Sequence, residues 1–147
     1  MRPMRIVVEV SATVRRLPLS KERVRDLVER TLRCERIRDA LVSVAFVGRS
    51  AIAQMNFDYL GHRGATDVIS FGMGRAMPTL PAVGDIYICP DVARANARRL
   101  GVPVREELSR LVVHGTLHVA GAEHPAGHDR IDSPMWRKQE RIIARAR

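Results

Sequence analysis

Apolar positions along the chain follow strand-like spacing in some segments and helical spacing in others. Apolar and β-branched residues fill 5–10 and 41–47, which predicts an opening strand and a second, buried strand. Between them, apolar residues recur with helical spacing from Val24 to Leu32. We expect a helix there that begins after the N-cap residue Ser20 and ends near residue 34.

The rest of the chain continues the same mixture. We expect, in order, a helix over about 50–59 ended by the turn 61–64, short strands over 67–71 and 85–89 joined by a Pro- and Gly-containing loop, and helices over 90–100, from 103 onward and over about 133–145. No internal repeat or linker divides the chain. The pattern therefore predicts one compact α+β domain over residues 1–147, a small mixed β-sheet packed with helices, whose topology it leaves open.

Composition adds limits on location and redox chemistry. The chain has 147 residues, 46% of them hydrophobic, which is enough for one core. No run approaches the roughly 20 apolar residues that span a bilayer, and the apolar segment near the start is too short for a signal peptide, so we expect a cytoplasmic protein. Cys34 and Cys89 form no CxxC pair, and we interpret them as small buried hydrophobic residues.

The chain is strongly basic, with a formal net charge of +9, and its basic residues are arginines except Lys21 and Lys138. The arginine side chain offers a planar fork that matches phosphate, so this excess is typical of proteins with an anionic polymer as partner. A compositional bias toward arginine explains it equally well. The charge is compatible with nucleic-acid binding without establishing it.

The candidate chemistry lies in a histidine cluster, since four of the five histidines fall between positions 114 and 128. His114 and His118 are four residues apart and share one face of a helix. Gly121 suits a turn through positive φ, which brings His124 back toward the same point. Three neutral nitrogen ligands leave a fourth position open, as in catalytic zinc sites. We therefore predict one Zn²⁺ ion on this helix and the loop after it, and we interpret His128 as an exposed loop residue.

The spacing resembles the HExxHxxGxxH motif of metzincin proteases, in which a glutamate follows the first histidine as general base. Here that position is Gly115, so the proton acceptor of a protease is missing. A glycine inside a helix costs on the order of 1 kcal/mol relative to alanine. Its presence predicts a close approach at this point, either by the strand beneath or by the substrate.

The flanking motifs extend a different resemblance over most of the chain. The segment His114-Gly-x-Leu-His118-x-x-Gly-x-x-His124 resembles the signature of the YbeY family of bacterial rRNA maturation factors. Further segments match the family in the same order: Asn56, Tyr59, Thr66 to Phe71, Gly84 to Ile86, and Met135 to Glu140. Three positions depart from the family's usual residues: Glu123 replaces Asp, Leu60 replaces Arg and Ala65 replaces Pro.

The resemblance implies a zinc-dependent endoribonuclease specific for single strands, which acts in rRNA maturation at the 3′ end of the small-subunit RNA and in ribosome quality control. It implies single-stranded RNA or rRNA and the small ribosomal subunit as partners, and no membrane. A zinc metalloprotease-like hydrolase and a non-catalytic ribosome-assembly factor with a structural zinc remain as alternatives. The oligomeric state is left open, as is whether zinc activates water or acts as a Lewis acid.

Other residues receive lesser roles. Arg63 and His62 lie in a predicted loop and are candidate phosphate contacts, with Arg63 as a substitute for the family's arginine at Leu60; an ordinary solvated loop explains both residues equally well. We expect Asp85 to be a satisfied strand-end carboxylate, with the alternative that it orients a ligand histidine. Thr66 and Asp67 are expected to fix the turn before their strand. Trp136 is expected to be a core anchor of the last helix.

Overall fold

The computed structural model describes residues 5–73, 79–121 and 134–146. Its elements follow the predicted order, with bounds that differ from the predicted ones by a few residues. They are β1 (Arg5–Ala12), α1 (Lys21–Cys34), β2 (Asp39–Phe46), α2 (Arg49–Leu60), β3 (Val68–Gly72), β4 (Ala82–Ile88), α3 (Pro90–Leu100), α4 (Val104–Val119) and α5 (Pro134–Ala146). The predicted α+β class is confirmed.

The four strands form one mixed sheet in the order β1-β2-β4-β3. β1 pairs with β2 and β2 with β4 in parallel, whereas β3 runs antiparallel to β4 along the edge of the sheet. The parallel pairs are joined through helical crossovers, as parallel strands require. β3 and β4 are consecutive strands of the chain and pair antiparallel.

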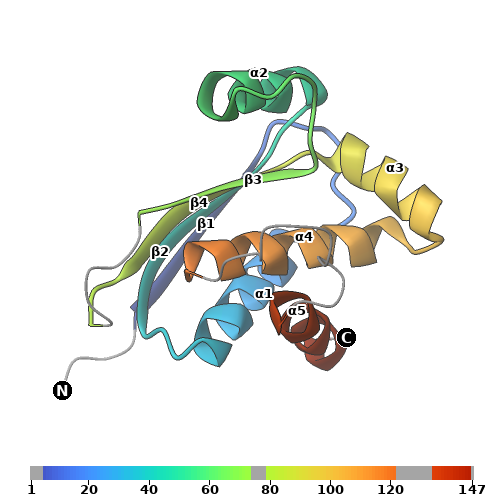
Figure 1. The fold of residues 1–147 in the computed structure, drawn as a ribbon. Helices are drawn as coiled ribbons and strands as arrows, with labels where there is room; N and C mark the ends of the chain where they lie inside the picture. Colours follow the sequence, from blue (N-terminus) through green and yellow to red (C-terminus); the bar gives the residue numbers. More distant parts are fainter. Residues whose placement is uncertain (1–4, 74–78, 122–133, 147) are drawn as a thin grey trace.

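The helices lie unevenly about the sheet (Figure 1). α1, α4 and α5 lie on one face, α3 continues from the end of β4, and α2 sits apart at one end of the sheet on the other side. The main core fills the space between the sheet and the first group. Its largest fully buried side chains include Leu27, Leu32, Phe46, Ile86 and Leu108. A smaller cluster of Val47, Ile52, Ile69 and Cys89 packs under α2.

The predicted buried strand is β2, and it is buried on one face of the sheet. Ala40, Val42, Val44 and Phe46 face the helices and are at most 4% exposed. Leu41, on the opposite face, is 48% exposed. Helices cover only one side of the sheet at this point (Figure 1), so buried residues of β2 alternate with more exposed ones.

The local signals at helix ends behave as expected. The hydroxyl of Ser20 accepts a hydrogen bond from the backbone N–H of Arg23 at 3.1 Å, so it caps α1. Gly121 follows α4 with φ of 102°, in the region that glycine adopts without strain. Gly121 therefore has the positive φ predicted for it.

Two expectations about composition have different outcomes. Cys89 is buried, but Cys34 is exposed, so the prediction for Cys34 was wrong. Cys34 is the last residue of α1, where its side chain points away from the apolar face of the helix. Within the described residues, no helix is both long and apolar enough to cross a membrane.

Candidate active site

One face of α4 carries a stripe of polar side chains. Glu107, Arg110, His114 and His118 follow one another at intervals of three, four and four residues, so they lie along the same side of the helix. All four line a cavity of about 410 Å³. Its other walls come from the start of β3, from α3 and from α5, where the lining residues are Thr66, Asp67, Val68, Ser70, Asn96, Arg99, Leu100, Trp136 and Gln139.

The two histidines meet at this cavity. Their Nε2 atoms lie 3.2 Å apart, and the ring centroids are 4.7 Å apart with the rings inclined by 74°. Two nitrogens that bind one zinc ion at 2.0–2.1 Å with a tetrahedral angle are separated by about 3.3–3.4 Å. The observed separation is close to that value. The donor set and its spacing therefore fit a shared metal ion.

The second nitrogen of His114 is already engaged. Its Nδ1 lies 2.8 Å from the side-chain oxygen Oε1 of Gln139 on α5. An amide oxygen only accepts hydrogen bonds, so in this contact Nδ1 is the donor, and a neutral ring with that hydrogen has its lone pair on Nε2. This is the protonation state that a metal ligand requires.

The predicted third ligand, His124, lies outside the described residues, as do His128 and Glu123. Among the described residues, no group of three or more His, Cys, Asp or Glu side chains is placed to bind a metal. The structure thus brings His114 and His118 together, and the three-histidine site stays a prediction.

Gly115 has a structural explanation. A Cβ atom at this position would lie 2.7 Å from Cγ2 of Ile86 on β4, closer than real Cβ contacts come. Of the two close approaches that the sequence suggested, the strand beneath is the one observed. A side chain at position 115 would point into the sheet, so a glutamate there would be buried against Ile86.

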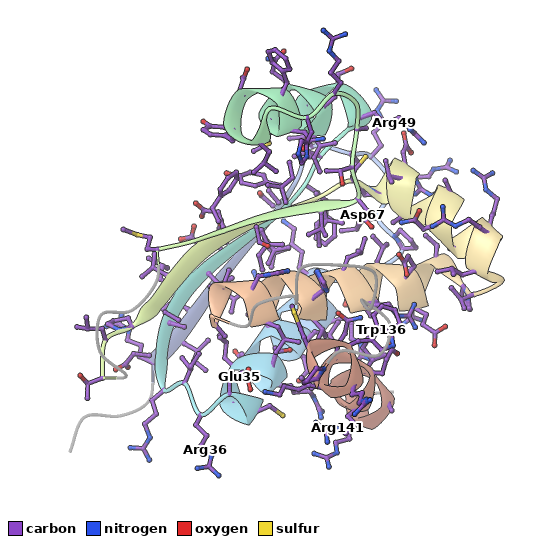
Figure 2. All side chains as sticks on the ribbon, in the orientation of Figure 1. Glu35, Arg36, Arg49, Asp67, Trp136 and Arg141 are labelled. Carbon is purple, nitrogen blue, oxygen red and sulfur yellow. The ribbon has the colours of Figure 1, made fainter. Side chains whose placement is uncertain are left out.

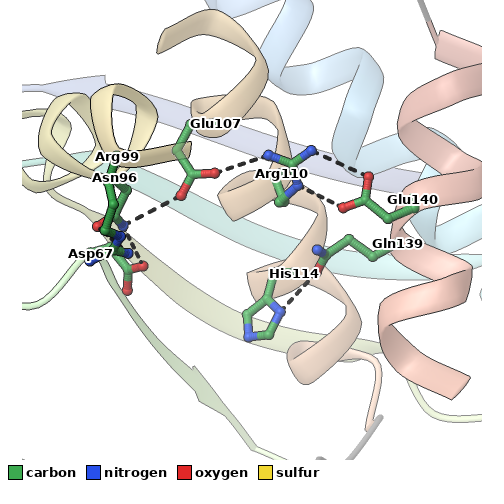
Figure 3. A network of polar contacts seen from close by, with 8 residues as sticks. All are labelled: Asp67, Asn96, Arg99, Glu107, Arg110, His114, Gln139 and Glu140. Carbon is green, nitrogen blue, oxygen red and sulfur yellow. Dashed lines mark hydrogen bonds and ion pairs between the residues drawn. The ribbon is translucent and has the colours of Figure 1, made fainter. Parts of the chain in front are cut away.

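A network of polar contacts runs along the cavity wall beside the histidines (Figure 3). Nδ2 of Asn96 donates to Asp67 at 3.1 Å and to Glu107 at 3.4 Å. Arg110 donates from Nη1 to Glu107 at 3.1 Å and from Nε to Glu140 at 2.6 Å. The network ties β3, α3, α4 and α5 together around the cavity.

Burial and the neighbouring charges shift the pKa values of Glu107 and Arg110 in this network. Glu107 is only 4% exposed, and its burial raises its pKa above the ordinary value despite hydrogen bonds from Arg110 and Asn96. The hydrogen bonds and charges of Glu140 and Glu107 raise the pKa of Arg110, against the opposing effect of burial. Arg110 is therefore a fixed cation whose charge is balanced by two carboxylates.

Thr66 and Asp67 have the role expected of them, and more. Oδ1 of Asp67 accepts from the backbone N–H of Val68 at 2.8 Å and from the Thr66 hydroxyl at 3.5 Å, which fixes the turn into β3. The other carboxylate oxygen of Asp67 belongs to the cavity network. Figure 2 shows Asp67 between the sheet and α3.

Asp85 lies away from the histidines. Successive residues of a strand point to opposite faces, and Ile86 faces α4, so Asp85 points to the other side of the sheet. There it accepts a hydrogen bond from the Ser43 hydroxyl at 2.5 Å. It is a satisfied strand carboxylate, as expected, and the alternative of orienting a histidine does not hold for His114 or His118.

The loop residues Arg63 and His62 lie away from the cavity, whereas Trp136 lines it. Arg63 and His62 are exposed in the segment after α2 and are not among the residues that line the cavity. Trp136 is half-buried rather than a core anchor: it lines the cavity, and the guanidinium carbon of Arg110 lies 5.9 Å from its ring centroid. The neighbouring Met135 is the residue that enters the core.

Several cavity residues were missed from the sequence. Arg110 and Glu107 could have been found, because they continue the spacing of the histidines back along α4. Asn96 and Arg99 carried no local signal, since they reach the cavity only through the packing of α3 on α4. Gln139 lies in the segment Met135 to Glu140 that resembles the family, but nothing local indicated its contact with His114.

Comparison with known proteins bears directly on this site. The model of the family described as Endoribonuclease YbeY matches residues 9–147, which include both histidines and the elements around the cavity. The chain belongs to the Endoribonuclease YbeY family. Similar curated members, each named Endoribonuclease YbeY, include one from Syntrophus aciditrophicus (30% identical, covering 95% of this chain and 89% of the relative) and one from Geobacter sulfurreducens (32% identical, 93% of each).

The fold agrees with this membership. The solution structure of TM1509 from Thermotoga maritima superposes with a TM-score of 0.65 at 25% identity, and the match covers 95% of this chain and 89% of that one. The fold and the sequence motifs of the YbeY family thus occur together in one chain.

Proposed function

We propose that this protein is a zinc-dependent endoribonuclease that cuts single-stranded RNA during ribosomal RNA maturation, including the 3′ end of the small-subunit RNA. The family and the names of the relatives support the nuclease part. The metal part rests on one observation, the approach of His114 Nε2 and His118 Nε2 to 3.2 Å at the wall of the cavity. In this proposal His124 completes the ligand set, and the protein acts at the small ribosomal subunit in the cytoplasm, where it contributes to quality control.

The metal, when bound, would supply a Lewis acid for a phosphate oxygen or for a water molecule. The residues of the chain then have separate tasks. His114 and His118 hold the ion. The cavity volume of about 410 Å³ lies in the range of small-ligand sites, so it suits one or two nucleotides of an unpaired strand better than a duplex.

Arg99 is the cavity residue best suited to contact a phosphate. Arg110 is held by Glu107 and Glu140, so its charge is already balanced. Arg99 is exposed at the cavity wall and donates to the neutral amide oxygen of Asn96 at 3.3 Å. Its charge remains available to a phosphate group. The proposal therefore assigns a phosphate contact to Arg99 as well as to Arg63.

The test is cleavage of an RNA strand and a DNA strand of the same sequence by wild-type protein, by His114→Ala and by the exposed control Arg105→Ala. Each protein is stripped of metal and then given zinc. We expect zinc to restore RNA cleavage in the wild type and the control, and His114→Ala to lose at least about 100-fold in rate. Equal cleavage by His114→Ala would overturn the catalytic role of the site.

Two further measurements address the remaining parts. Elemental analysis should find about one zinc per wild-type chain and less in His118→Ala; unchanged zinc content would mean that the ligand set is wrong. In cells, depletion of the protein should lengthen the 3′ ends of small-subunit rRNA. Normal ends would exclude the maturation role, and zinc binding without RNA cleavage would favour an assembly factor.

A further inference from the structure

A single side chain from α5 reaches across to the histidine pair on α4. Gln139 is only 1% exposed, and its Oε1 atom lies 2.8 Å from Nδ1 of His114, 25 residues earlier in the chain. Figure 3 shows the amide directed at the ring nitrogen. This contact fixes the orientation of the imidazole ring of His114.

We infer that Gln139 is a positioning residue, whose side-chain carbonyl selects the His114 tautomer that leaves Nε2 free to bind the metal. This inference rests on the proposed metal site. If Nδ1 lost its acceptor, the hydrogen could move to Nε2, the atom that faces His118. A ring protonated at Nε2 must give up that hydrogen and change its hydrogen bonds before it can bind the ion there.

The other end of the same amide argues against a purely structural role. Among the described residues, Nε2 of Gln139 is the buried side-chain polar atom that lacks a hydrogen-bond partner. A buried N–H without a partner destabilises a fold, and an apolar residue of similar size would avoid this cost. The stability of the protein therefore does not explain the glutamine, whereas the contact with His114 does.

The neighbours of Gln139 hold it in place. Glu140 is bound to Arg110 on α4 at 2.6 Å, and Nζ of Lys138 lies 2.8 Å from Glu35 just after α1. Ion pairs on both sides thus fix α5 against the two helices that it contacts. The amide reaches His114 from a rigid element, as precise positioning requires.

The experiment compares the wild type with Gln139→Leu, which removes the acceptor at similar volume, and with Gln139→Glu, which keeps an acceptor. Thr116→Val is the matched control, because Thr116 is buried on α4, the helix of His114, and its hydroxyl donates to the Val112 carbonyl instead. Zinc affinity is measured by competition with a chelator of known strength. The ¹⁵N shifts of the His114 ring in the metal-free protein report its tautomer, and a thermal melt reports its stability.

We expect Gln139→Leu to weaken zinc binding by about 10- to 100-fold and to shift His114 toward the tautomer protonated at Nε2. We expect Gln139→Glu and Thr116→Val to stay within about threefold of the wild type in zinc affinity, and Gln139→Leu to melt no lower than the wild type without metal. Unchanged zinc affinity and tautomer in Gln139→Leu would overturn the inference. So would a lower melting temperature in Gln139→Leu with the tautomer unchanged, because it would indicate a structural role.

The same measurements separate this inference from the proposal beneath it. His118→Ala should lose zinc affinity if the metal site is correct. Loss in His118→Ala without loss in Gln139→Leu would refute only the positioning role. Unchanged affinity in both would refute the metal site itself.

Discussion

The contact between Gly115 and Ile86 allows a quantitative test of how α4 is seated on the sheet. Gly115→Ala should gain about 1 kcal/mol from helix propensity. The added Cβ, however, would lie 2.7 Å from Cγ2 of Ile86 and 3.3 Å from its Cγ1 and Cδ1 atoms. Ile86 is fully buried and β-branched, so its methyl group cannot swing away.

Inserting a methyl group into such a packed site costs about 1–3 kcal/mol, and the rigidity of Ile86 places this case in the upper part of that range. We therefore expect Gly115→Ala to lower the free energy of unfolding by about 1–2 kcal/mol, despite the better helix former. Urea denaturation of the metal-free protein, followed by far-UV circular dichroism, measures this change. A variant as stable as the wild type would show that helix propensity outweighs the contact.

Repeating the substitution in the Ile86→Ala variant tests the contact itself, without relying on the absolute change in the free energy of unfolding. In Ile86→Ala the clashing methyl is gone, so Gly115→Ala should there stabilise the protein through propensity alone. Ile86→Ala itself should cost about 2–5 kcal/mol, so all four proteins are compared in the same concentration of sucrose. The same effect of Gly115→Ala in both backgrounds would refute the assigned contact.

Three further changes test the cavity network and a helix cap. Burial raises the pKa of the Glu107 carboxyl. The stabilising contribution of protonated Glu107 is therefore complete below the ordinary pKa of 4.5, and it is lost as the pH rises through the raised pKa. Glu107→Gln should therefore flatten the rise of stability toward acid in urea titrations between pH 4.5 and 8, and an unchanged profile would contradict the cause given. Arg110→Met leaves Glu107 and Glu140 without their shared cation and should cost about 2–4 kcal/mol in unfolding free energy; a loss below 1 kcal/mol would mean that solvent screens the network. Ser20→Ala removes the cap on Arg23 N–H and should cost about 1 kcal/mol, which a melt unchanged within error would disprove.

The elements of this fold were predictable because their signals are local. The helix ends at Ser20 and Gly121 depend on side-chain capping and on a positive φ, both encoded by the residue itself. The order β1-β2-β4-β3 and the exposure of Leu41 and Cys34 were not predictable. They depend on which surfaces the helices cover, and strand alternation or helical spacing does not specify that.

The residues of the candidate site show the same difference between local signals and tertiary packing. His114 and His118 were found because four residues make about one turn of helix, and their convergence follows from that geometry alone. Gln139 and Arg99 lie on other helices, and only the packing of α3 and α5 against α4 brings them to the cavity. The spacing of α4 thus predicts that the two histidines converge, whereas the other polar side chains of the cavity depend on tertiary structure.

The distribution of charge bears on how an RNA strand would be bound. At the cavity, Arg110 is paired with Glu107 and Glu140, and Asp67 adds a further negative charge to the lining. The net charge of +9 therefore resides mainly elsewhere, on exposed side chains such as Arg36, Arg49 and Arg141 in Figure 2. Electrostatic attraction of a polyanion would then come from the wider surface, where it is sensitive to salt. A cavity close to neutral would instead select, among phosphates already held nearby, the one that fits between Arg99 and the histidines.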